Sequence, residues 1–537
     1  MSIHNKIDRE SSNAITNALS FFETPNTNVS VSSSSVIELL TLNPVNITPY
    51  HFKIHASTNY IDLAKCYIFT ELKITKEDKD GKLVSLEATD NVACCQLIGH
   101  TLWKNCRISI NGTQIFEGNS LMAYKSIFDY ELTGKEFYLS AAGYYDDGDI
   151  NLKGVGFETR KSLFSSSPQN SAQFIAKLDV DICNQPRYLV NQCEVDIELL
   201  PNDSNFLLIA PNNINKIKYH LEVLACKLYV KKIELMDSLA FDISKKLEMK
   251  PARYPMRKTS LKSLFISENR TEFNANLWAD QVPRRVILGM VKNIDFVGSQ
   301  DAHPFNFQHF DLRDISITAG GITFPAAPYS LDFPKGKFCR IFHDMQEAIG
   351  YAGSLESNGI SMERFSSGGY CILAFNLTNS QEDNGPETIK LTFNKPIPTG
   401  GVVLIAMGEV DSLLFIGQKS HDYEPSFLLD FHSYFIFIKI LNKNYAFLFV
   451  NFISDKFLKI ISVDSKPFVM ANADEYPQYR DYLRKKNLEL ILLKANNSPI
   501  FEQNDQVFEF EQLGNKLNLP LPCTEIKDDS GGIIFIV

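Results

Sequence analysis

The feature that most constrains the fold of this chain is an alternation of apolar and polar residues with a period of two. In CEVDIELL (193–200), Val195, Ile197 and Leu199 alternate with three acidic residues. The same pattern recurs in CYIFTELKI (66–74), KIKYHLEVLA (216–225) and TIKLTFN (388–394). Successive side chains of a strand point to opposite faces, so this pattern predicts strands with one buried and one solvated face. Such strands are typical of antiparallel sheets, whereas parallel sheets are apolar on both faces.

Turn residues separate several of these predicted strands. In CRISINGTQIF (106–116), Asn111-Gly112 stands between two short alternating runs, and Asn-Gly accepts the positive φ angles of a two-residue hairpin turn. Gly320-Gly321 takes the same place in ISITAGGITF (315–324). The strand-rich region spans residues 36–416, which is too long for one eight-stranded sandwich. We therefore predict two antiparallel β-sandwiches.

A helical segment divides the strand-rich region. In MDSLAFDISKKLEMKP (236–251), Leu239, Ile243 and Leu247 recur at helical spacing, and Pro251 ends the helix. We place the boundary between the two sandwiches here. The predicted domains are a flexible tail over residues 1–35, a first sandwich over 36–236, a second sandwich over 237–425 and a C-terminal extension over 426–537.

The extension differs from the rest of the chain in composition. Its run FHSYFIFIKILNKNYAFLFVNFISDKFLKII (431–461) consists almost wholly of residue types that A/T-rich codons encode. One interpretation is a hairpin in which YFIFIKIL and YAFLFVNFI pair around residues 442–444. The other is translated non-coding sequence, such as a retained intron, and we favour this second interpretation.

Charge and hydropathy exclude several classes of function. The net charge is −10, whereas a protein that coats nucleic acid needs Lys and Arg to displace counterions from phosphates. We expect no direct sequence-specific nucleic-acid binding. The first residues, MSIHNKIDRESSNAITN, hold no apolar core of a secretory signal, so we predict an intracellular protein. The most apolar run is interrupted by Lys439 and residues 442–444, so we predict no membrane span.

The cysteines indicate buried free thiols in a reducing compartment. No two of them have the CxxC spacing of many metal sites, and their density is far below that of a disulfide scaffold. The ten cysteines stand at positions 66, 94, 95, 106, 183, 193, 226, 339, 371 and 523.

The stretch DAHPFNFQHFDLRDISITAGG (301–321) gathers four candidate site residues: His303, His309, Asp311 and Asp314. Two histidines six positions apart do not share a helix face, and on one strand they would lie about 20 Å apart. We interpret the stretch as a loop that leads into a strand. In this interpretation Pro304, Phe305 and Phe307 pack the loop, and the histidines are polar residues at its edge.

The acidic loop YYDDGDINLKGVGFE (144–158) is a second candidate. Asp147, Asp149, Asn151 and Glu158 fall at positions one, three, five and twelve of a calcium loop, but position six holds Leu152 where that loop needs glycine. We favour a solvated surface loop. The alternative is a calcium site, or a glycan site that uses the exposed aromatic and acidic side chains of residues 144–147.

Enzyme signatures are missing from the sequence. It contains no HExxH, no GxxxxGK[ST], no GxGxxG after a strand and no GxSxG. We therefore predict a protein that is not an enzyme, with no catalytic, cofactor-binding or metal-binding residues.

Three segments of the second predicted sandwich carry a family resemblance: VPRRVILG (282–289), HPFNF (303–307) and LRDISITAGG (312–321). They resemble a strand, a loop and a second strand of the major capsid proteins encoded by Polinton (Maverick) DNA elements, which are virus-like transposons of eukaryotic genomes. The resemblance covers residues 1–425 and leaves the extension outside it. Other segments that fit in the same order are 60–76, 102–116, 187–200, 362–378 and 389–416.

The resemblance implies an all-β double jelly roll, in which two eight-stranded antiparallel β-sandwiches lie side by side with short helices in the loops. It also implies a structural major capsid protein that forms homotrimeric, pseudo-hexagonal capsomers of an icosahedral virus-like shell. The expected partners are further copies of the chain and a single-jelly-roll vertex protein, and the expected location is the capsid, assembled in the nucleus or cytoplasm. The alternative is a β-sandwich module that binds glycans or calcium.

Overall fold

The computed structural model describes most of residues 28–417 and a set of strands within residues 433–472. In the first range the described residues exclude 88, 134–136, 148–153, 168, 212, 214–215, 280–281 and 378–386, and residues 17–19 and 21 are described in addition. Residues 1–425 form one compact unit, and residues 426–537 form another.

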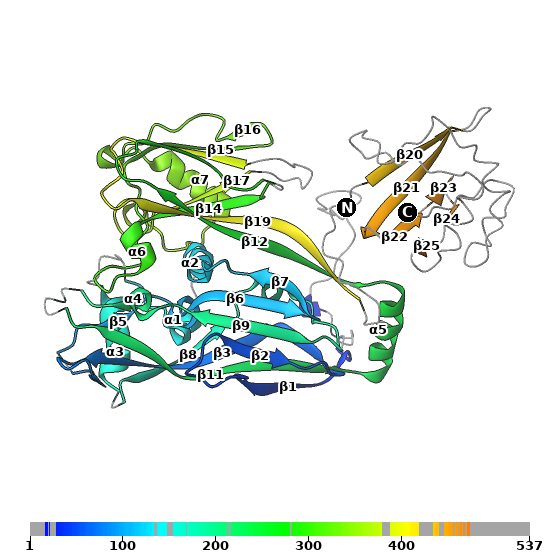
Figure 1. Ribbon diagram of the computed structural model, residues 1–537, viewed down its shortest axis with the longest axis horizontal. Helices are drawn as coiled ribbons and strands as arrows, with labels where there is room; N and C mark the ends of the chain where they lie inside the picture. Colours follow the sequence, from blue (N-terminus) through cyan, green and yellow to red (C-terminus); the bar gives the residue numbers. More distant parts are fainter. Residues whose placement is uncertain are drawn as a thin grey trace, which may run out of the picture. The chain divides into compact units, whose positions relative to one another are not determined.

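The first lobe of the larger unit, residues 31–235, is a sandwich of two antiparallel sheets (Figure 1). One sheet has the order β1-β11-β3-β4, with β8 paired to β3, and the other has the order β2-β9-β6-β7. The strands of the first sheet are β1 (Val31–Leu40), β3 (Tyr60–Glu77), β4 (Leu83–Ser85), β8 (Ser171–Lys177) and β11 (Tyr219–Leu235). Those of the second are β2 (Tyr50–Ile54), β6 (Trp103–Ile110), β7 (Thr113–Glu117) and β9 (Val195–Pro201), and a small pair joins β5 (Ala93–Cys94) to β10 (Leu208–Ile209).

The second lobe, residues 252–416, is a sandwich of two four-stranded antiparallel sheets. The first sheet has the order β12-β19-β14-β17, and the second has the order β13-β18-β15-β16. The strands of the first sheet are β12 (Ala252–Ile266), β14 (Arg285–Lys292), β17 (Ile372–Asn376) and β19 (Val402–Ile416). Those of the second are β13 (Glu272–Asn276), β15 (Leu312–Ala319), β16 (Ile322–Phe324) and β18 (Glu387–Phe393).

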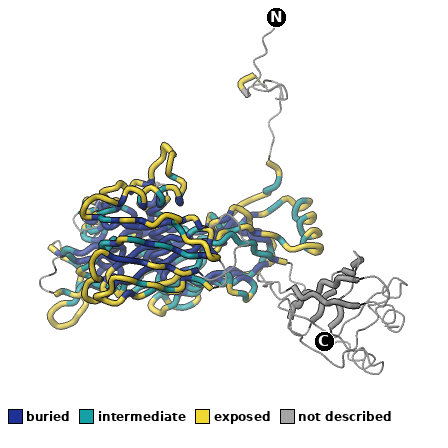
Figure 2. The backbone as a smooth tube through the Cα atoms, turned by 90° about the horizontal axis from the view of Figure 1, so that it is seen from above, coloured by how far each residue is buried: buried dark blue, intermediate teal, exposed yellow. Residues whose placement is uncertain are grey.

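The period-two pattern places the strands as the sequence predicts. Along β3, the residues from Cys66 to Ile74 alternate between buried and half-buried positions, and the buried set faces the interior of the first lobe. Asn111 and Gly112 have φ angles of 51° and 83° and close the hairpin of β6 and β7. Gly320-Gly321 closes the hairpin of β15 and β16 in the same way. Figure 2 shows buried residues running through the interior of the larger unit and exposed residues along its loops.

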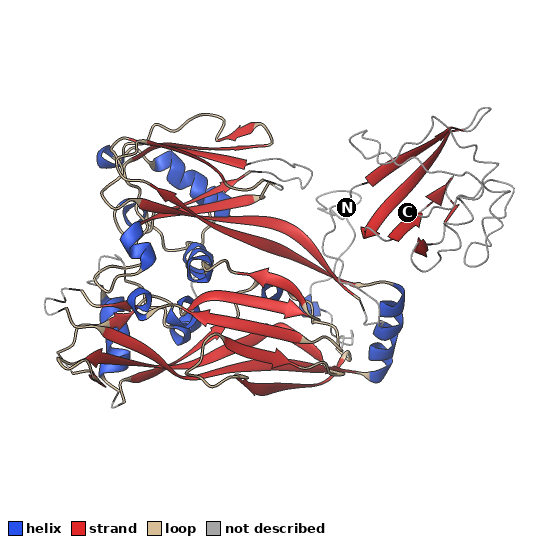
Figure 3. Cartoon of the chain, in the orientation of Figure 1, coloured by secondary structure: helices blue, strands red, loops and turns tan. Residues whose placement is uncertain are grey.

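Short helices occupy the loops and the space between the lobes, and strands take up more of the cartoon than helices do (Figure 3). The predicted helix near residues 236–251 is α5 (Asp237–Met249), which links the lobes and buries none of its residues. The other α-helices are α1 (Ile98–Thr101), α2 (Met122–Leu132), α3 (Val155–Ser165), α4 (Ser204–Leu207), α6 (Asn293–Val297), α7 (Cys339–Ile349) and α8 (Met362–Ser366). The 3-10 helices are η1 (Asn17–Leu19), η2 (Phe137–Ala142), η3 (Asp181–Asn184) and η4 (Phe333–Lys335). No helix in the described part of the chain combines the length and apolarity that a membrane span requires.

Two details differ from the sequence-based expectations. Strand β1 begins at Val31, inside the range predicted as a flexible tail, because residues 31–40 pair with β11. Cys339 is exposed, whereas the other eight described cysteines are buried free thiols as predicted, and Cys523 lies outside the described residues.

The smaller unit contains the segment with two interpretations. Strands β20 (Ser433–Lys439) and β21 (Tyr445–Ser454) pair antiparallel, as the hairpin interpretation predicts. The remaining strands of this unit are β22 (Phe457–Ile460), β23 (Ser462–Val463), β24 (Lys466–Pro467) and β25 (Met470–Asn472). The translated non-coding origin of this region stays a prediction.

Candidate functional site at the joint between the lobes

Helix α2 of the first lobe lies between the two lobes in Figure 1 and forms the centre of their contact. Nine of its eleven residues are buried, with only Asp129 and Tyr130 half-exposed. A helix that is buried on nearly every side is a core element rather than a surface helix. The loop of residues 301–311 from the second lobe packs against α2, so the stretch that gathered the candidate site residues belongs to this contact.

Six aromatic side chains form what we call the aromatic joint. The Tyr124 ring lies 5.4 Å from the Phe305 ring and 5.7 Å from the Phe296 ring, measured between centroids, and its hydroxyl donates to the Pro304 carbonyl at 3.1 Å. Each such aromatic pair is worth about 0.5–1.5 kcal/mol beyond the burial of its area. The joint therefore fixes the second lobe on the first through directional contacts that are mostly buried. Its members are Tyr124, Phe128, Phe206, Phe296, Phe305 and Phe307.

Gly289 brings two of the segments that carry the resemblance, 282–289 and 303–307, into contact. A Cβ atom at Gly289 would lie 2.6 Å from the Phe307 ring and 3.0 Å from the Phe128 ring, closer than carbon atoms approach without a shift. Phe307 and Phe128 are themselves buried in the joint. The glycine that ends VPRRVILG therefore makes room for the last phenylalanine of HPFNF, and that phenylalanine contacts the first lobe.

The prediction that His303 lies at the edge of its loop was wrong. The side chain is only 3% exposed, and its Nδ1 accepts a hydrogen bond from the Phe305 backbone N–H at 3.1 Å. Burial lowers the pKa of His303 to about 3, so the ring is neutral at neutral pH. Helix α2 covers the loop, and the sequence around His303 carries no signal of that cover.

The other three residues of the candidate cluster have separate structural partners. His309 is half-buried and stacks on Phe333 at 3.9 Å between ring centroids. The Asp311 carboxylate pairs with Lys395 at 2.6 Å, and the Asp314 carboxylate accepts from the Tyr329 backbone N–H at 2.9 Å. Within the described residues no group of three or more His, Cys, Asp or Glu side chains is arranged to hold a metal ion.

Two arginine side chains donate hydrogen bonds to carboxylates of the acidic loop. Asp147 is buried and accepts from Arg160 Nη2 at 2.9 Å, and Arg160 is fully buried in the first lobe. Asp146 accepts two hydrogen bonds, at 2.9 and 3.1 Å, from Arg364 of the second lobe. The prediction of a solvated loop was therefore wrong at Asp147, which is buried against Arg160 of its own lobe, whereas Asp146 makes a second contact between the lobes.

The same geometry disfavours the calcium and glycan alternatives. One oxygen of the Asp147 carboxylate, Oδ2, pairs with Arg160, whereas the side chain of Glu158 is 65% exposed and pairs with Lys161 at 3.6 Å. Tyr144, which the glycan alternative needs as an exposed ring, is buried. Asp149 and Asn151 lie outside the described residues.

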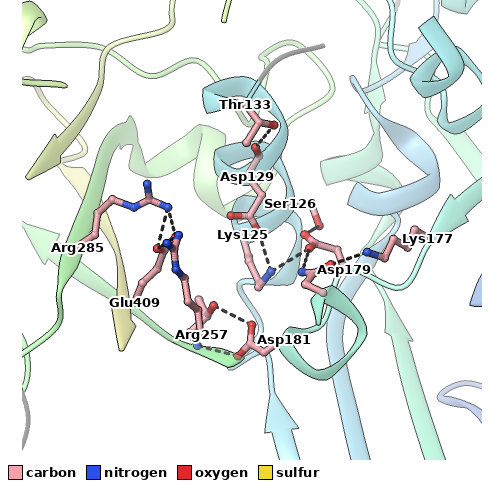
Figure 4. A network of polar contacts seen from close by, with 12 residues as sticks. Lys125, Ser126, Asp129, Thr133, Lys177, Asp179, Asp181, Arg257, Arg285 and Glu409 are labelled. Atoms are coloured by element: carbon pink, nitrogen blue, oxygen red, sulfur yellow. Dashed lines mark hydrogen bonds and ion pairs between the residues drawn. The ribbon is translucent and has the colours of Figure 1, made fainter. Parts of the chain in front are cut away.

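A charged cleft lies beside the aromatic joint (Figure 4). Its volume is about 870 Å³, and side chains of both lobes line it. Lys125 of α2 is 1% exposed and contacts the carboxylates of Asp129 at 2.7 Å and Asp179 at 3.0 Å. Burial by itself would lower the pKa of Lys125, but these two carboxylates raise it well above its usual value. Lys125 is therefore a charged residue inside the protein, where an unpaired ammonium would cost several kcal/mol.

Hydrogen bonds across this cleft join the lobes directly. Asp181 of the first lobe accepts from the backbone N–H of Thr259 at 2.7 Å and from its hydroxyl at 2.8 Å. Thr259 belongs to β12 of the second lobe. Two other residues of the second lobe, Glu409 and Arg285, also line the cleft and pair with each other at 2.8 Å. The cleft thus adds polar contacts to the apolar contacts of the aromatic joint.

Comparison with the sequences of known proteins identifies a relative of this chain. No protein-family model matches the chain. It is 30% identical over 386 residues to the uncharacterized protein F54H12.2 of Caenorhabditis elegans, and the match covers 68% of this chain and 90% of the nematode protein. The chain belongs to the same family as this nematode protein.

Solved structures identify the fold. A chain of the Sputnik virophage, from a cryo-EM structure, matches with a TM-score of 0.54 at 12% identity, over 78% of this chain and 95% of that chain. The mavirus major capsid protein matches with a TM-score of 0.48 at 10% identity, over 76% of this chain and 94% of that one. The Faustovirus major capsid protein matches with a TM-score of 0.46 at 10% identity, over 74% and 92% of the two chains. The fold is a double jelly roll, as predicted.

The contacts between the lobes can hold the two sandwiches in one fixed arrangement. Apolar rings, a bidentate ion pair and hydrogen bonds connect α2, the acidic loop and η3 of the first lobe to three segments of the second. The sequence alone did not identify Lys125, Arg160 and Asp179, which belong to the buried ion pairs beside the aromatic joint. The one available signal was the spacing of Lys125 and Asp129, four residues apart in an otherwise apolar run, which is the spacing of an ion pair along a helix.

Proposed function

We propose that this protein is a structural major capsid protein whose two lobes act as one rigid building block of a shell. The observation that carries the proposal is the joint, in which ring contacts and hydrogen bonds lock two jelly rolls of one chain together. A wall unit has to keep its shape while neighbours press on it, and a packed interior gives that resistance. The similarity of fold to a chain of the Sputnik virophage supports this role over an enzymatic one.

The proposed assembly is a homotrimer with a pseudo-hexagonal outline. Each chain supplies two similar lobes, so three chains related by a cyclic axis present six. We propose that such capsomers tile an icosahedral shell and that a separate single-jelly-roll protein occupies the vertices. The location would be the capsid, assembled inside the cell.

We further propose that the chain is encoded by an integrated Polinton-type element. The support is the ordered resemblance of segments 282–289, 303–307 and 312–321. The structure adds that Gly289 and Phe307 of these segments depend on one packing contact. In this proposal the lobes correspond to residues 36–236 and 237–425, and residues 426–537 are an extension of separate origin.

The mass of the purified protein in solution tests the assembly. Light scattering after size exclusion should give about three times the chain mass of 60.8 kDa, and negative-stain images should show six-sided particles. A monomer at micromolar concentration would contradict the proposal, and a monomer that binds glycans would support the binding-module alternative instead.

The origin of the extension needs a separate measurement. Peptide mass spectrometry of the protein from its natural source should find peptides from residues 36–416 and none from residues 432–460. Peptides from both ranges at similar abundance would overturn the non-coding interpretation.

A further inference from the structure

A small buried cavity lies where the acidic loop of the first lobe meets the 301–311 loop of the second. Its volume is about 10 Å³, and its lining includes Asp147, Gln96 and Ile127 of the first lobe and His303 and Tyr370 of the second. Asp147 Oδ1 and His303 Nε2 are both buried, and neither has a hydrogen-bond partner within the part of the chain that the structure describes. Two polar atoms of opposite lobes thus line one small space without contacting a partner.

The hydrogen bonds of His303 determine which of its nitrogen atoms carries the proton. Nδ1 accepts from the Phe305 backbone N–H at 3.1 Å, so its lone pair is occupied. In a neutral imidazole one nitrogen accepts and the other donates. The burial that lowers the pKa of His303 to about 3 keeps the ring neutral, so Nε2 carries the hydrogen and is a donor.

Asp147 supplies the complementary acceptor. Its Oδ2 is occupied by Arg160 at 2.9 Å, whereas Oδ1 is the oxygen without a partner among the described residues. Gly156 lies against this oxygen, because a Cβ atom there would approach Oδ1 to 2.5 Å. His303 Nε2 and Asp147 Oδ1 are thus one donor and one acceptor without partners among the described residues, and each costs about 1–3 kcal/mol when it is buried without a hydrogen bond.

The polar neighbour Gln96 makes no hydrogen bond to either of these two atoms. Its Oε1 accepts from the Tyr145 backbone N–H at 2.9 Å and from Arg160 at 3.0 Å, and its amide nitrogen donates to the Tyr145 carbonyl. Its hydrogen-bonding groups are thus committed to the acidic loop and to Arg160. Of the remaining lining, Ile127, Phe305 and Phe307 are apolar, whereas Glu131 of the first lobe and Tyr370 of the second are two further polar residues.

We propose that this cavity is a binding site for one water molecule that joins the two lobes. The water accepts from His303 Nε2–H and donates to Asp147 Oδ1, so one molecule satisfies a polar group of each lobe. A buried water needs about 10–15 Å³ of such space and two to four polar partners, and the cavity meets both conditions. A metal ion would need a lone pair on His303 Nε2, where the hydrogen is, and would lie close to the Arg160 guanidinium.

A crystal structure of the full chain at a resolution that shows ordered waters tests this site. The expected result is one isolated density peak about 2.7–3.2 Å from both His303 Nε2 and Asp147 Oδ1. An empty cavity, or a peak in contact with only one of the two atoms, would overturn the proposal. So would a peak about 2.0–2.1 Å from Nε2, the distance of a zinc–histidine bond.

The variant His303→Phe tests whether the histidine holds the water. The density peak should be absent from its crystal structure, while the matched variant His309→Phe, which changes a half-buried stacked histidine, should keep it. A peak that persists in His303→Phe would overturn the assignment of the donor. If His303→Phe does not fold, the density in the unmodified protein still decides the proposal.

Discussion

The two lobes share a fold but contribute different chemistry to the contact between them. The first lobe contributes buried charges that are paired, since Lys125 and Arg160 are each at most 1% exposed and contact the carboxylates of Asp179 and Asp147. Each lobe supplies three of the six rings of the aromatic joint, so the paired buried charges are what the first lobe adds.

The most deeply buried carboxyl group of the second lobe differs from these paired charges, because it has no partner among the described residues. Glu387 is fully buried at the start of β18, and neither of its oxygens has a hydrogen-bond partner among the described residues. Burial raises the pKa of Glu387 to about 8. The comparison teaches that a buried ionisable group stays charged only where the fold supplies a fixed counter-charge, and is neutral elsewhere.

The largest expected effect concerns the aromatic side of the joint. Phe305→Ala should lower the free energy of unfolding by about 3–5 kcal/mol, because it leaves a cavity among rings of both lobes. Chemical denaturation of the purified protein measures this change. The control Phe265→Ala removes a ring that is 54% exposed in the same lobe and should cost less than about 1 kcal/mol. Equal effects of the two variants would show that the joint does not stabilise the protein.

A slightly smaller loss is expected on the charged side of the joint. Lys125→Met should lower the free energy of unfolding by about 3 kcal/mol, because methionine fills the space but leaves the Asp129 and Asp179 carboxylates without their cation. The control Lys395→Met breaks a surface pair with Asp311 and should cost about 1 kcal/mol or less. If Lys125→Met were as stable as the control, the contrast between the lobes would have no energetic basis.

An intermediate effect should follow from added volume at Gly289. Gly289→Ala should cost about 1–3 kcal/mol, because the new methyl group displaces the Phe307 ring. The matched substitution Gly417→Ala adds a methyl group where no described residue apart from its chain neighbours lies within 4 Å, and it should change stability by less than about 0.5 kcal/mol. Thermal melts of both variants make the measurement, and an unchanged melting temperature for Gly289→Ala would refute the tight packing.

The smallest expected effect is a gain that depends on pH. The pKa of Glu387 is about 8 in the folded protein and near its usual 4.5 in the unfolded chain, so folding takes up a proton between these pH values. The folded protein then binds more protons than the unfolded chain, and stability falls as pH rises from about 4.5 to about 8. Glu387→Gln should remove this loss and stabilise the protein by about 1–2 kcal/mol at pH 8, with little change at pH 4.

The exposed Glu272 on the neighbouring strand β13 provides the control. Glu272→Gln should leave the melting temperature unchanged at both pH values, because its side chain faces solvent. A Glu387→Gln variant that is no more stable than the unmodified protein at pH 8 would mean that Glu387 is charged and has a counter-charge after all.

Local patterns in the sequence determined the strands, their buried faces and several turns. The alternation in residues 66–74 predicted the buried face of β3, and Asn111-Gly112 and Gly320-Gly321 predicted two hairpins. These predictions hold because strand period and turn chemistry depend on residues that are close in sequence. The helix at residues 237–249 was predictable for the same reason.

Only the tertiary structure decided which polar residues lie inside the joint. Lys125 and Asp179 are 54 positions apart, and Asp146 and Arg364 are 218 positions apart, so no local pattern links them. His303 was expected at the edge of a loop because its own neighbours do not reveal that α2 of the other lobe covers it. A residue's exposure depends on which segments pack over it, and the packing of one lobe on the other is a property of the whole chain.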